Sequence, residues 1–471
     1  MNPRTDWTPD SWRRLHADQQ PTWPDLGALD DVIKRLTGMP PLIFAGEARS
    51  LTSELARAQG GDAFVLQAGD CAETFEDFSA DRVKNVLKVI LQMSAVLAYS
   101  SGVPTIRIGR VAGQFAKPRT VATETVDGEE LPTYRGDIIN RVPPDRASRT
   151  PDAANILRAY EQAASTLNLL RGFTKGGFAD LASVHEWNRE FLAASSEGHR
   201  YEAIASGIDA ALRFMRVCGV DSPSLHEVDF YASHEALLLP YEEALTRQDS
   251  THDDDWYDCS AHMLWVGNRT RELDHAHVEF LSGINNPVGC KIDSNCTPQY
   301  VLELCDRLNP ARHPGRLTLI SRMGCDRIVD HLPPIIDAVN DSGHRVLWMC
   351  DPMHGNTFKS DGGLKTRRFE DIFEEISRYF SIHRAAHTWP GGIHLELTGE
   401  NVTECLGGPD DLEDHELHAH YETACDPRLN ARQSLDLAFL VAELLADFPP
   451  PATTDTRQFP PTDRPAPAAA K

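Results

Sequence analysis

The sequence of 471 residues lacks the features of membrane, secreted and repeat proteins. No apolar run approaches the ~20 residues that cross a bilayer, and the N-terminus, MNPRTDWTPDSWRRL, lacks the apolar core of a secretory signal. The ten cysteines form no C-x-x-C pair, so we expect reduced thiols in a cytoplasmic protein rather than a disulfide framework. We also find no internal repeat, and we expect no contact with a membrane.

Positive charge is scarce as well. The chain has 46 Lys and Arg against 70 Asp and Glu, a formal net charge of -24. Such a surface repels polyanions, so nucleic acid is not an expected partner. Any phosphate chemistry must therefore depend on a local basic pocket. The apolar residues, 41% of the chain, suffice for a sizeable core.

From residue 63 onward, short apolar runs alternate with helical patterns. We predict strands at Ala63–Gln67, Thr105–Gly109, Val228–Tyr231, Met263–Val266, Val288–Lys291, Leu317–Ser321, Val346–Cys350 and Ile393–Leu397. Buried strands that alternate with helices indicate a parallel sheet, and eight is the number that closes a TIM barrel. The fold class predicted is therefore α/β, a (β/α)8 barrel.

Three further segments complete the predicted organisation. Residues 1–60 form an N-terminal extension packed on the barrel, with a helix near Asp30 to Leu36. The catalytic barrel covers 61–448 and carries a helical insertion, 151–218, between the second and third strands. The insertion is either additional core, a subunit interface or a regulatory site. Residues 449–471, rich in Pro and Ala, are expected to be a disordered tail.

Reactive side chains gather where the predicted strands end, which is where TIM barrels place their active sites. The first strand runs into QAGDCAE (67–73), the seventh into CDPMHGN (350–356), the eighth spans GGIHLELT (391–398), and CDPRLN (425–430) follows. One Cys, one His, one Glu and one Asp can thus converge on a single rim. Mixed S, N and O ligands suit a divalent transition metal.

The same rim also carries cations. They are Arg107, Arg110, Lys117, Arg119, Arg269, Arg271, Lys291 and Arg322. Arg binds phosphate and carboxylate through two parallel hydrogen bonds, and Lys acts as a point charge. A metal beside several cations is typical of a site for a small substrate with several negative charges.

Long sequence blocks give the chain a family resemblance. They are QAGDCAETF (67–75), GRVAGQFAKPR (109–119), YRGDIIN (134–140), HEWNREF (185–191), YASHEAL (231–237), RLTLISRMG (316–324), DPMHGNT (351–357), GGIHLELTGENVTECLGG (391–408) and YETACDPRLN (421–430). Through them the chain resembles the type II (plant-like) 3-deoxy-D-arabino-heptulosonate 7-phosphate (DAHP) synthases, from about residue 21 to 448. These enzymes condense phosphoenolpyruvate with erythrose 4-phosphate in the first step of the shikimate pathway, which leads to the aromatic amino acids.

The resemblance implies specific roles for residues of this chain. It implies metal ligation by Cys71, His354, Glu396 and Asp426, with Mn²⁺ or Co²⁺ as the cofactor and Fe²⁺ or Zn²⁺ as alternatives. It implies that phosphoenolpyruvate is bound by Arg110, Arg269, Lys291 and Arg322, and the phosphate of the aldose by Lys117 and Arg119. It also implies a homo-oligomer, a dimer or tetramer, with aromatic amino acids as effectors.

Two departures from the family pattern lie near the expected site. Asn268 stands where the family has Glu, and Asp293 and Ser294 replace the Gly-Pro that follows the strand-five lysine. They leave three interpretations open: the ordinary condensation, a condensation with a modified acceptor such as the aminated sugar of aminoshikimate pathways, or a non-catalytic regulatory paralogue. A metal hydrolase on the same barrel is a further rival, but the dense Arg and Lys set counts against it. A regulatory subunit would be expected to lose metal ligands, and all four are present.

Overall fold

The computed structural model describes residues 6–126, 128–194, 198–220, 223–249, 251 and 255–448. The predicted disordered tail, 449–471, lies outside this range. Within it, none of the helices combines the length and apolar character that a membrane span requires.

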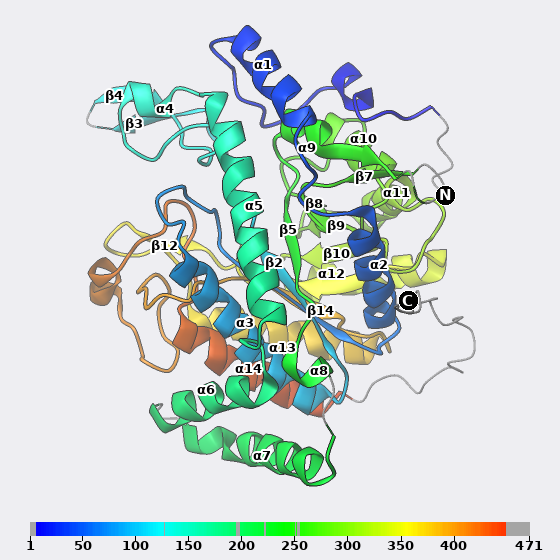
Figure 1. Cartoon of the computed structure of the whole chain (residues 1–471), viewed down its shortest axis with the longest axis vertical. Coiled ribbons are helices and arrows are strands. Elements are labelled where there is room, and N and C mark those ends of the chain that lie inside the picture. Colours follow the sequence, from blue (N-terminus) through cyan, green and yellow to red (C-terminus); the bar gives the residue numbers. More distant parts are fainter. Residues whose placement is uncertain are drawn as a thin grey trace, which may run out of the picture.

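Eight parallel strands close into a barrel in the order β1-β14-β11-β10-β9-β8-β5-β2 (Figure 1). Their bounds are β1 Phe64–Gly69, β2 Thr105–Arg110, β5 Tyr231–Glu235, β8 Met263–Val266, β9 Val288–Ile292, β10 Leu317–Ser321, β11 Leu347–Cys350 and β14 Gly392–Glu396. Each pairs in parallel with its neighbours, as Phe64 with Thr105 and Leu317 with Val288. The predicted (β/α)8 barrel is confirmed.

The third barrel strand was placed wrongly from the sequence. The prediction was Val228–Tyr231, whereas β5 begins at Tyr231 and ends at Glu235. The apolar run thus precedes the strand, and the strand itself carries polar side chains that are buried. Ser233 Oγ donates to the carbonyl of Gly109 at 3.0 Å, and His234 Nε2 lies 3.0 Å from Glu242 Oε1. Because these buried polar side chains have hydrogen-bond partners, the strand lacks the apolar run on which the prediction relied.

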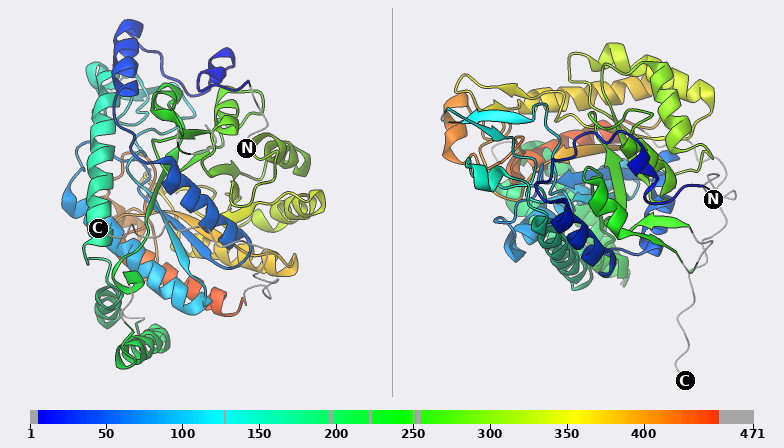
Figure 2. Two further views of the ribbon diagram at one scale, coloured as in Figure 1. Left: turned by 45° about the vertical axis from the view of Figure 1, so that its right-hand side comes forward. Right: turned by 90° about the horizontal axis from the view of Figure 1, so that it is seen from above.

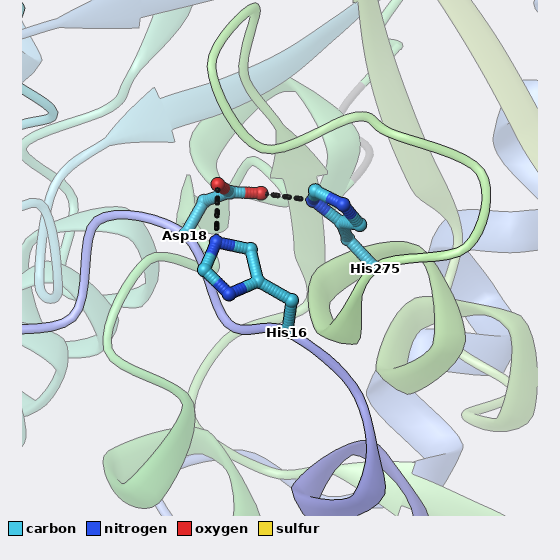
Figure 3. Close-up of side chains that lie close together, drawn as sticks. All are labelled: His16, Asp18 and His275. Atoms are coloured by element: carbon cyan, nitrogen blue, oxygen red, sulfur yellow. Dashed lines mark hydrogen bonds and ion pairs between the residues drawn. The ribbon is translucent and has the colours of Figure 1, made fainter.

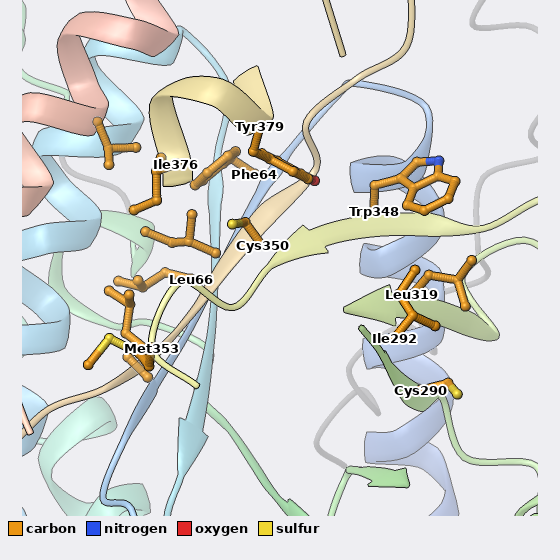
Figure 4. Packing of buried hydrophobic residues seen from close by; sticks show 14 of the residues in the cluster. Phe64, Leu66, Cys290, Ile292, Leu319, Trp348, Cys350, Met353, Ile376 and Tyr379 are labelled. Carbon is orange, nitrogen blue, oxygen red and sulfur yellow. The ribbon is translucent and has the colours of Figure 1, made fainter. Parts of the chain in front are cut away.

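Helices connect the strands and cover the outside of the barrel (Figure 2). They are α3 Ala80–Ser101, α9 Leu239–Leu245, α10 Ala276–Gly283, α11 Pro298–Leu308, α12 Ile328–Ser342, α13 Phe369–Ala385 and α14 Ala431–Ala446. Several begin at side-chain caps: Ser79 accepts from Arg82 N, Thr297 from Tyr300 N, and Asn430 from Gln433 N. Apolar side chains fill the layer between strands and helices; Figure 4 shows part of it, including Phe64, Ile376 and Tyr379.

The barrel interior changes from apolar to charged along its axis. At one end Val65, Ile106 and Met263 form a cluster with Leu51 and Leu55 of α2 (Ala45–Gln59), so α2 closes this end. In the next layer Gln67 Nε2 donates to Ser233 Oγ at 2.9 Å, and His394 Nδ1 lies 2.8 Å from Gln67 Oε1. The charged side chains Arg110, Glu235, Lys291 and Glu396 come at the opposite end, where the strands end.

The insertion between β2 and β5 contains the long helices α5 Ala154–Lys175, α6 Leu181–Ala194 and α7 Glu202–Val217. Helix α5 runs along the side of the barrel (Figures 1 and 2). Its apolar face is intramolecular core: Leu167 is only 4% exposed, and its cluster includes Leu29 and Leu36 of α1 (Leu26–Thr37). This face is therefore not available as a subunit interface. The C-terminal half of α7 does expose Phe214 and Val217.

The remaining elements are short. They are the helices α4 Arg146–Arg149 and α8 Pro223–His226, the 3-10 turns η1 Ser11–Arg14, η2 Gly198–Tyr201 and η3 Asp414–Ala419, and the hairpins β3 Thr123–Val126 with β4 Glu129–Pro132, β6 Thr246–Gln248 with β7 Trp256–Asp258, and β12 Phe358–Lys359 with β13 Lys365–Thr366.

Candidate active site

The residues predicted to bind the metal meet at the charged end of the barrel. Ligand atoms of Cys71, Glu396 and Asp426 all lie within 4.8 Å of one another. His354 joins them, with its Nε2 3.1 Å from Glu396 Oε1. Four side chains that lie up to 355 positions apart in the sequence thus form one ring, with one sulfur, one nitrogen and two carboxylates.

The ammonium group of Lys117 lies among these ligand atoms. Its Nζ is 3.2 Å from Cys71 Sγ, 3.0 Å from Glu396 Oε1 and 2.9 Å from Asp426 Oδ2. Burial works to lower the pKa of Lys117, but the attraction of the Asp426 and Glu396 carboxylates outweighs burial and raises the pKa. Lys117 therefore carries a positive charge among the four side chains.

Neighbouring side chains hold the ring in place. Asp351 Oδ2 lies 2.8 Å from His354 Nδ1, which leaves Nε2 of the imidazole facing Glu396. Arg367, fully buried, donates to Glu396 Oε2 at 2.8 Å. The backbone N–H of Asp426 donates to Cys71 Sγ at 3.2 Å. Gly69 permits the close turn before Cys71, because a Cβ there would lie 2.6 Å from the carbonyl oxygen of Arg110.

Charge balance keeps the two carboxylates ionised. Burial works to raise the pKa of Glu396, but His354, Lys117 and Arg367 outweigh it, and the pKa falls well below its usual range. The pKa of Asp426 is also lowered, since Lys117 overcomes the effect of burial. Burial raises the pKa of the Cys71 thiol, so without a metal this sulfur keeps its proton.

A cavity of about 330 Å³ opens next to the ring. Seven cationic side chains line it: Arg110, Lys117, Arg119, Arg269, Lys291, Arg322 and Lys365. The cations lie close enough to repel one another. Burial lowers the pKa of Arg269, and the charge of Arg322 lowers it further. Burial lowers the pKa of Lys291 to about 8, against the opposing effect of Asp351. Such a concentration of positive charge on a chain of net charge -24 favours an anionic ligand.

Arg110 is held against the cavity wall by donors on all three of its guanidinium nitrogens. Its Nε donates to the carbonyl of Asp70 at 3.0 Å, its Nη2 donates to Glu396 Oε1 at 3.0 Å, and its Nη1 contacts His394 Nε2. Arg110 therefore contributes positive charge to the wall of the cavity, while Arg269, Lys291 and Arg322 come from the ends of neighbouring strands.

Four polar residues of the site were missed from the sequence: Glu235, Asp351, Lys365 and Arg367. Glu235 lines the cavity, its Oε1 is buried without a hydrogen-bond partner among the described residues, and burial raises its pKa. It lies in the YASHEAL block, but the misplaced third strand ended four positions before it. A third strand that ended at Glu235 would have placed this residue on the rim with the other site residues.

The departures from the family pattern compensate for each other. Asn268 Nδ2 donates to Asp293 Oδ2 at 2.5 Å, and Arg271 Nη2 donates to Asp293 Oδ1 at 2.9 Å. Burial works to raise the pKa of Asp293, but Asn268 and Arg271 bring it down to about 2. Among the described residues that line the cavity, Asn268 is present, and Asp293 and Ser294 are not. The added carboxylate is therefore neutralised away from the cavity.

The chain as a whole matches a known protein family. The model of the Class-II DAHP synthetase family matches residues 7–442. The chain belongs to the class-II DAHP synthetase family. The prediction of this family from the sequence blocks is confirmed.

Two relatives of this DAHP synthetase family member are curated proteins. The phospho-2-dehydro-3-deoxyheptonate aldolase of Streptomyces coelicolor is 54% identical over 437 residues, covering 93% of this chain and 97% of its own length. The enzyme of the same name from Mycolicibacterium smegmatis is 49% identical, covering 92% and 93%. A Thermotoga maritima DAHP synthase structure covers 82% of this chain and 70% of its own, at 12% identity and a TM-score of 0.36, too weak a likeness to add to the barrel topology.

Proposed function

We propose that this chain condenses phosphoenolpyruvate with erythrose 4-phosphate to give DAHP and phosphate, and that it requires a divalent metal, Mn²⁺ or Co²⁺. The observation that carries the proposal is the cation-lined cavity directly beside the Cys71, His354, Glu396 and Asp426 ring. Family membership narrows the anionic ligands to these two substrates. The product would enter the shikimate pathway.

The four side chains fit a divalent transition metal. Three of their ligand atoms already surround one cation, the ammonium of Lys117, at 2.9 to 3.2 Å. Bonds of ~2.0–2.3 Å to a metal would need only a modest contraction of this ring. Thiolate, imidazole and carboxylate together suit Mn²⁺, Co²⁺, Fe²⁺ or Zn²⁺. A bound metal would act as a Lewis acid that polarises the aldehyde oxygen of the acceptor.

The cations at the strand ends would hold phosphoenolpyruvate. Arg269, Lys291 and Arg322 have the charge to bind its phosphate and carboxylate, and Arg110 adds charge from the wall. Arg119, which also lines the cavity, would bind the phosphate of the acceptor. Fixing both substrates this way removes much of the entropic barrier to their reaction.

The reaction then requires one new carbon–carbon bond and the addition of one water molecule. C3 of phosphoenolpyruvate bonds to the aldehyde carbon with the electrons of its C2=C3 double bond, and the aldehyde oxygen takes up one proton. Water gives up one proton and its oxygen bonds to C2; the C2–O bond to phosphate then breaks, and the second water proton leaves with the phosphate as the C2 carbonyl forms. We assign to Glu235 the task of orienting this water and accepting its proton at Oε1. In the part of the chain that the structure describes, that oxygen has no hydrogen-bond partner, and the raised pKa of Glu235 lies nearer neutral pH than that of an ordinary carboxyl. Asn268 cannot accept this proton.

The geometry of Asp293 favours the ordinary acceptor over an aminated one. A cationic acceptor would be attracted by an unbalanced carboxylate in the cavity, but Arg271 and Asn268 neutralise Asp293 outside it. The test is to incubate the purified protein, Mn²⁺ and phosphoenolpyruvate with erythrose 4-phosphate or with its aminated analogue. The proposal expects the heptulosonate product with erythrose 4-phosphate at a higher kcat/KM. A preference for the aminated sugar would reject it.

A further inference from the structure

A second group of metal-ligand side chains lies where the N-terminal extension meets helix α10. It consists of His16, Asp18 and His275, and none of them lines the active-site cavity (Figure 3). His275 is the residue that precedes α10. The group therefore joins two segments more than 250 positions apart in the sequence.

The three side chains converge on one point. Asp18 lies between the two imidazole rings, with His16 Nε2 3.2 Å from its Oδ1 and His275 Nδ1 2.5 Å from its Oδ2 (Figure 3). One ligand atom of each residue lies within 4.8 Å of the other two. Ligands of a tetrahedral zinc ion with ~2.0–2.1 Å bonds are separated by roughly 3.3 Å. The two separations to Asp18, 2.5 and 3.2 Å, and the limit of 4.8 Å for the group bracket this value.

The surroundings hold these side chains at their places. The backbone N–H of Ala276 donates to the carbonyl of His16 at 2.9 Å, which fixes the extension against the start of α10. Gln20 Nε2 donates to the carbonyl of Leu237 at 2.7 Å. Both anchors flank Asp18, so bringing the ligands around an ion requires side-chain rotation rather than movement of the backbone.

The segment between these anchors also contacts the active site. The backbone N–H of Arg119 donates to Gln19 Oε1 at 2.9 Å, and Arg135 Nη1 donates to the carbonyl of Gln19 at 3.1 Å. Gln19 has a φ of 60°, the left-handed region that non-glycine residues seldom adopt. An ion on Asp18 would therefore stabilise the strained backbone that supports the Arg119 loop.

We propose that His16, Asp18 and His275 bind a divalent transition metal of the zinc class, which fastens residues 16–20 to the start of α10. Two imidazoles and one carboxylate suit Zn²⁺ or Co²⁺, and water completes the coordination. A metal ion needs an unprotonated nitrogen on each imidazole ring, so the site takes the ion when both imidazoles are neutral.

The test is a titration of metal-stripped full-length protein with Co²⁺. Cobalt bound by Cys71 gives a thiolate charge-transfer band, and cobalt bound by imidazoles and a carboxylate gives d–d bands without it. We expect two equivalents in the unmodified protein, only one accompanied by the thiolate band. His16→Gln, at a side chain that is 70% exposed, and His275→Ala should each weaken the equivalent without thiolate at least tenfold and leave the thiolate band intact.

A matched control is His415→Ala. His415 Nδ1 lies 3.2 Å from Glu413 Oε2, an exposed imidazole–carboxylate pair without a third ligand among the described residues. This variant should bind both equivalents. A single equivalent that carries the thiolate band in the unmodified protein, or two equivalents in His16→Gln and His275→Ala at unchanged affinity, would overturn the proposal. A single equivalent without the thiolate band would support this site and count against the catalytic metal.

Amide hydrogen exchange tests separately whether the bound ion holds residues 16–20 against the start of α10. The amides of Ala276 and Arg119 donate to the carbonyl of His16 and to Gln19 Oε1. With Zn²⁺ bound, exchange at both amides should slow at least tenfold in the unmodified protein and stay unchanged in His16→Gln. Unchanged exchange in the unmodified protein at saturating Zn²⁺ would show that the ion does not fasten the segment.

Discussion

Replacing Lys117 by methionine removes the charge that balances the ligand ring and keeps most of the volume. The ammonium contacts three ring atoms at 2.9 to 3.2 Å, and the side chain is 9% exposed. Breaking a buried ion pair on one side costs about 3–5 kcal/mol. Because Arg367 still binds Glu396 and Lys365 still binds Asp426, we expect a loss near the lower end, about 3 kcal/mol in the free energy of unfolding without metal.

A divalent ion should reverse this loss. Mn²⁺ at 100 times its Kd stabilises a protein by ~2.7 kcal/mol. In the Lys117→Met variant Mn²⁺ binds without displacing an ammonium, so its Kd is lower than in the unmodified protein, and the same Mn²⁺ concentration gives a larger stabilisation. We therefore expect Mn²⁺ to stabilise the variant more than the unmodified protein. Urea unfolding with and without Mn²⁺ measures both quantities.

Lys365→Met is the matched control for this experiment. Lys365 also binds Asp426, at 3.1 Å, but its side chain is 42% exposed, so we expect a loss of at most ~1 kcal/mol. An equal loss in the two variants, or an equal gain from Mn²⁺, would refute the idea that Lys117 takes the place of a metal.

Three other perturbations test separate parts of the site and fold. Lys291 is charged below its pKa of about 8, so kcat/KM for phosphoenolpyruvate should fall as pH rises through about 8. Lys291→Arg should move that fall to higher pH, and a pH profile unchanged in the variant would contradict this. Asn268→Glu would place a second carboxylate next to Asp293, so we expect this variant to lose stability and the added change Asp293→Gly to restore it. A double-mutant cycle should give a coupling free energy of about 0.5–3 kcal/mol, and strictly additive effects would reject the coupling. Leu167→Asp should destabilise the fold by several kcal/mol in denaturant unfolding, whereas Phe214→Asp on the exposed face of α7 should leave stability nearly unchanged.

The barrel was predictable because buried parallel strands give short apolar runs at regular intervals. All eight predicted strands overlap the observed ones, but the third, Val228–Tyr231, shares only Tyr231 with β5. This strand buries Ser233, His234 and Glu235; the hydroxyl of Ser233, the imidazole of His234 and the backbone N–H of Glu235 have their partners in other segments. No local pattern reveals those partners, so the strand end and Glu235 were missed together.

The ring of ligands could be proposed from strand ends and family blocks, but its charge balance could not. Arg367 lies after β13, and only the folded chain places it against Glu396. The compensation of Asp293 by Arg271 likewise depends on contacts between adjacent barrel strands. For the same reason, the apolar face of α5 gave no sign of whether α1 or another subunit would cover it. The predicted oligomer and effectors stay predictions.

The central claim is that this site joins phosphoenolpyruvate to erythrose 4-phosphate with the help of a divalent metal. The most direct measurement is to incubate metal-stripped protein with both substrates, with and without Mn²⁺, and to follow phosphate release and the mass of the product. We predict one phosphate per heptulosonate formed, and turnover only when Mn²⁺ is present. Full turnover in the stripped protein, or phosphate release without a carbon–carbon bond, would contradict the account.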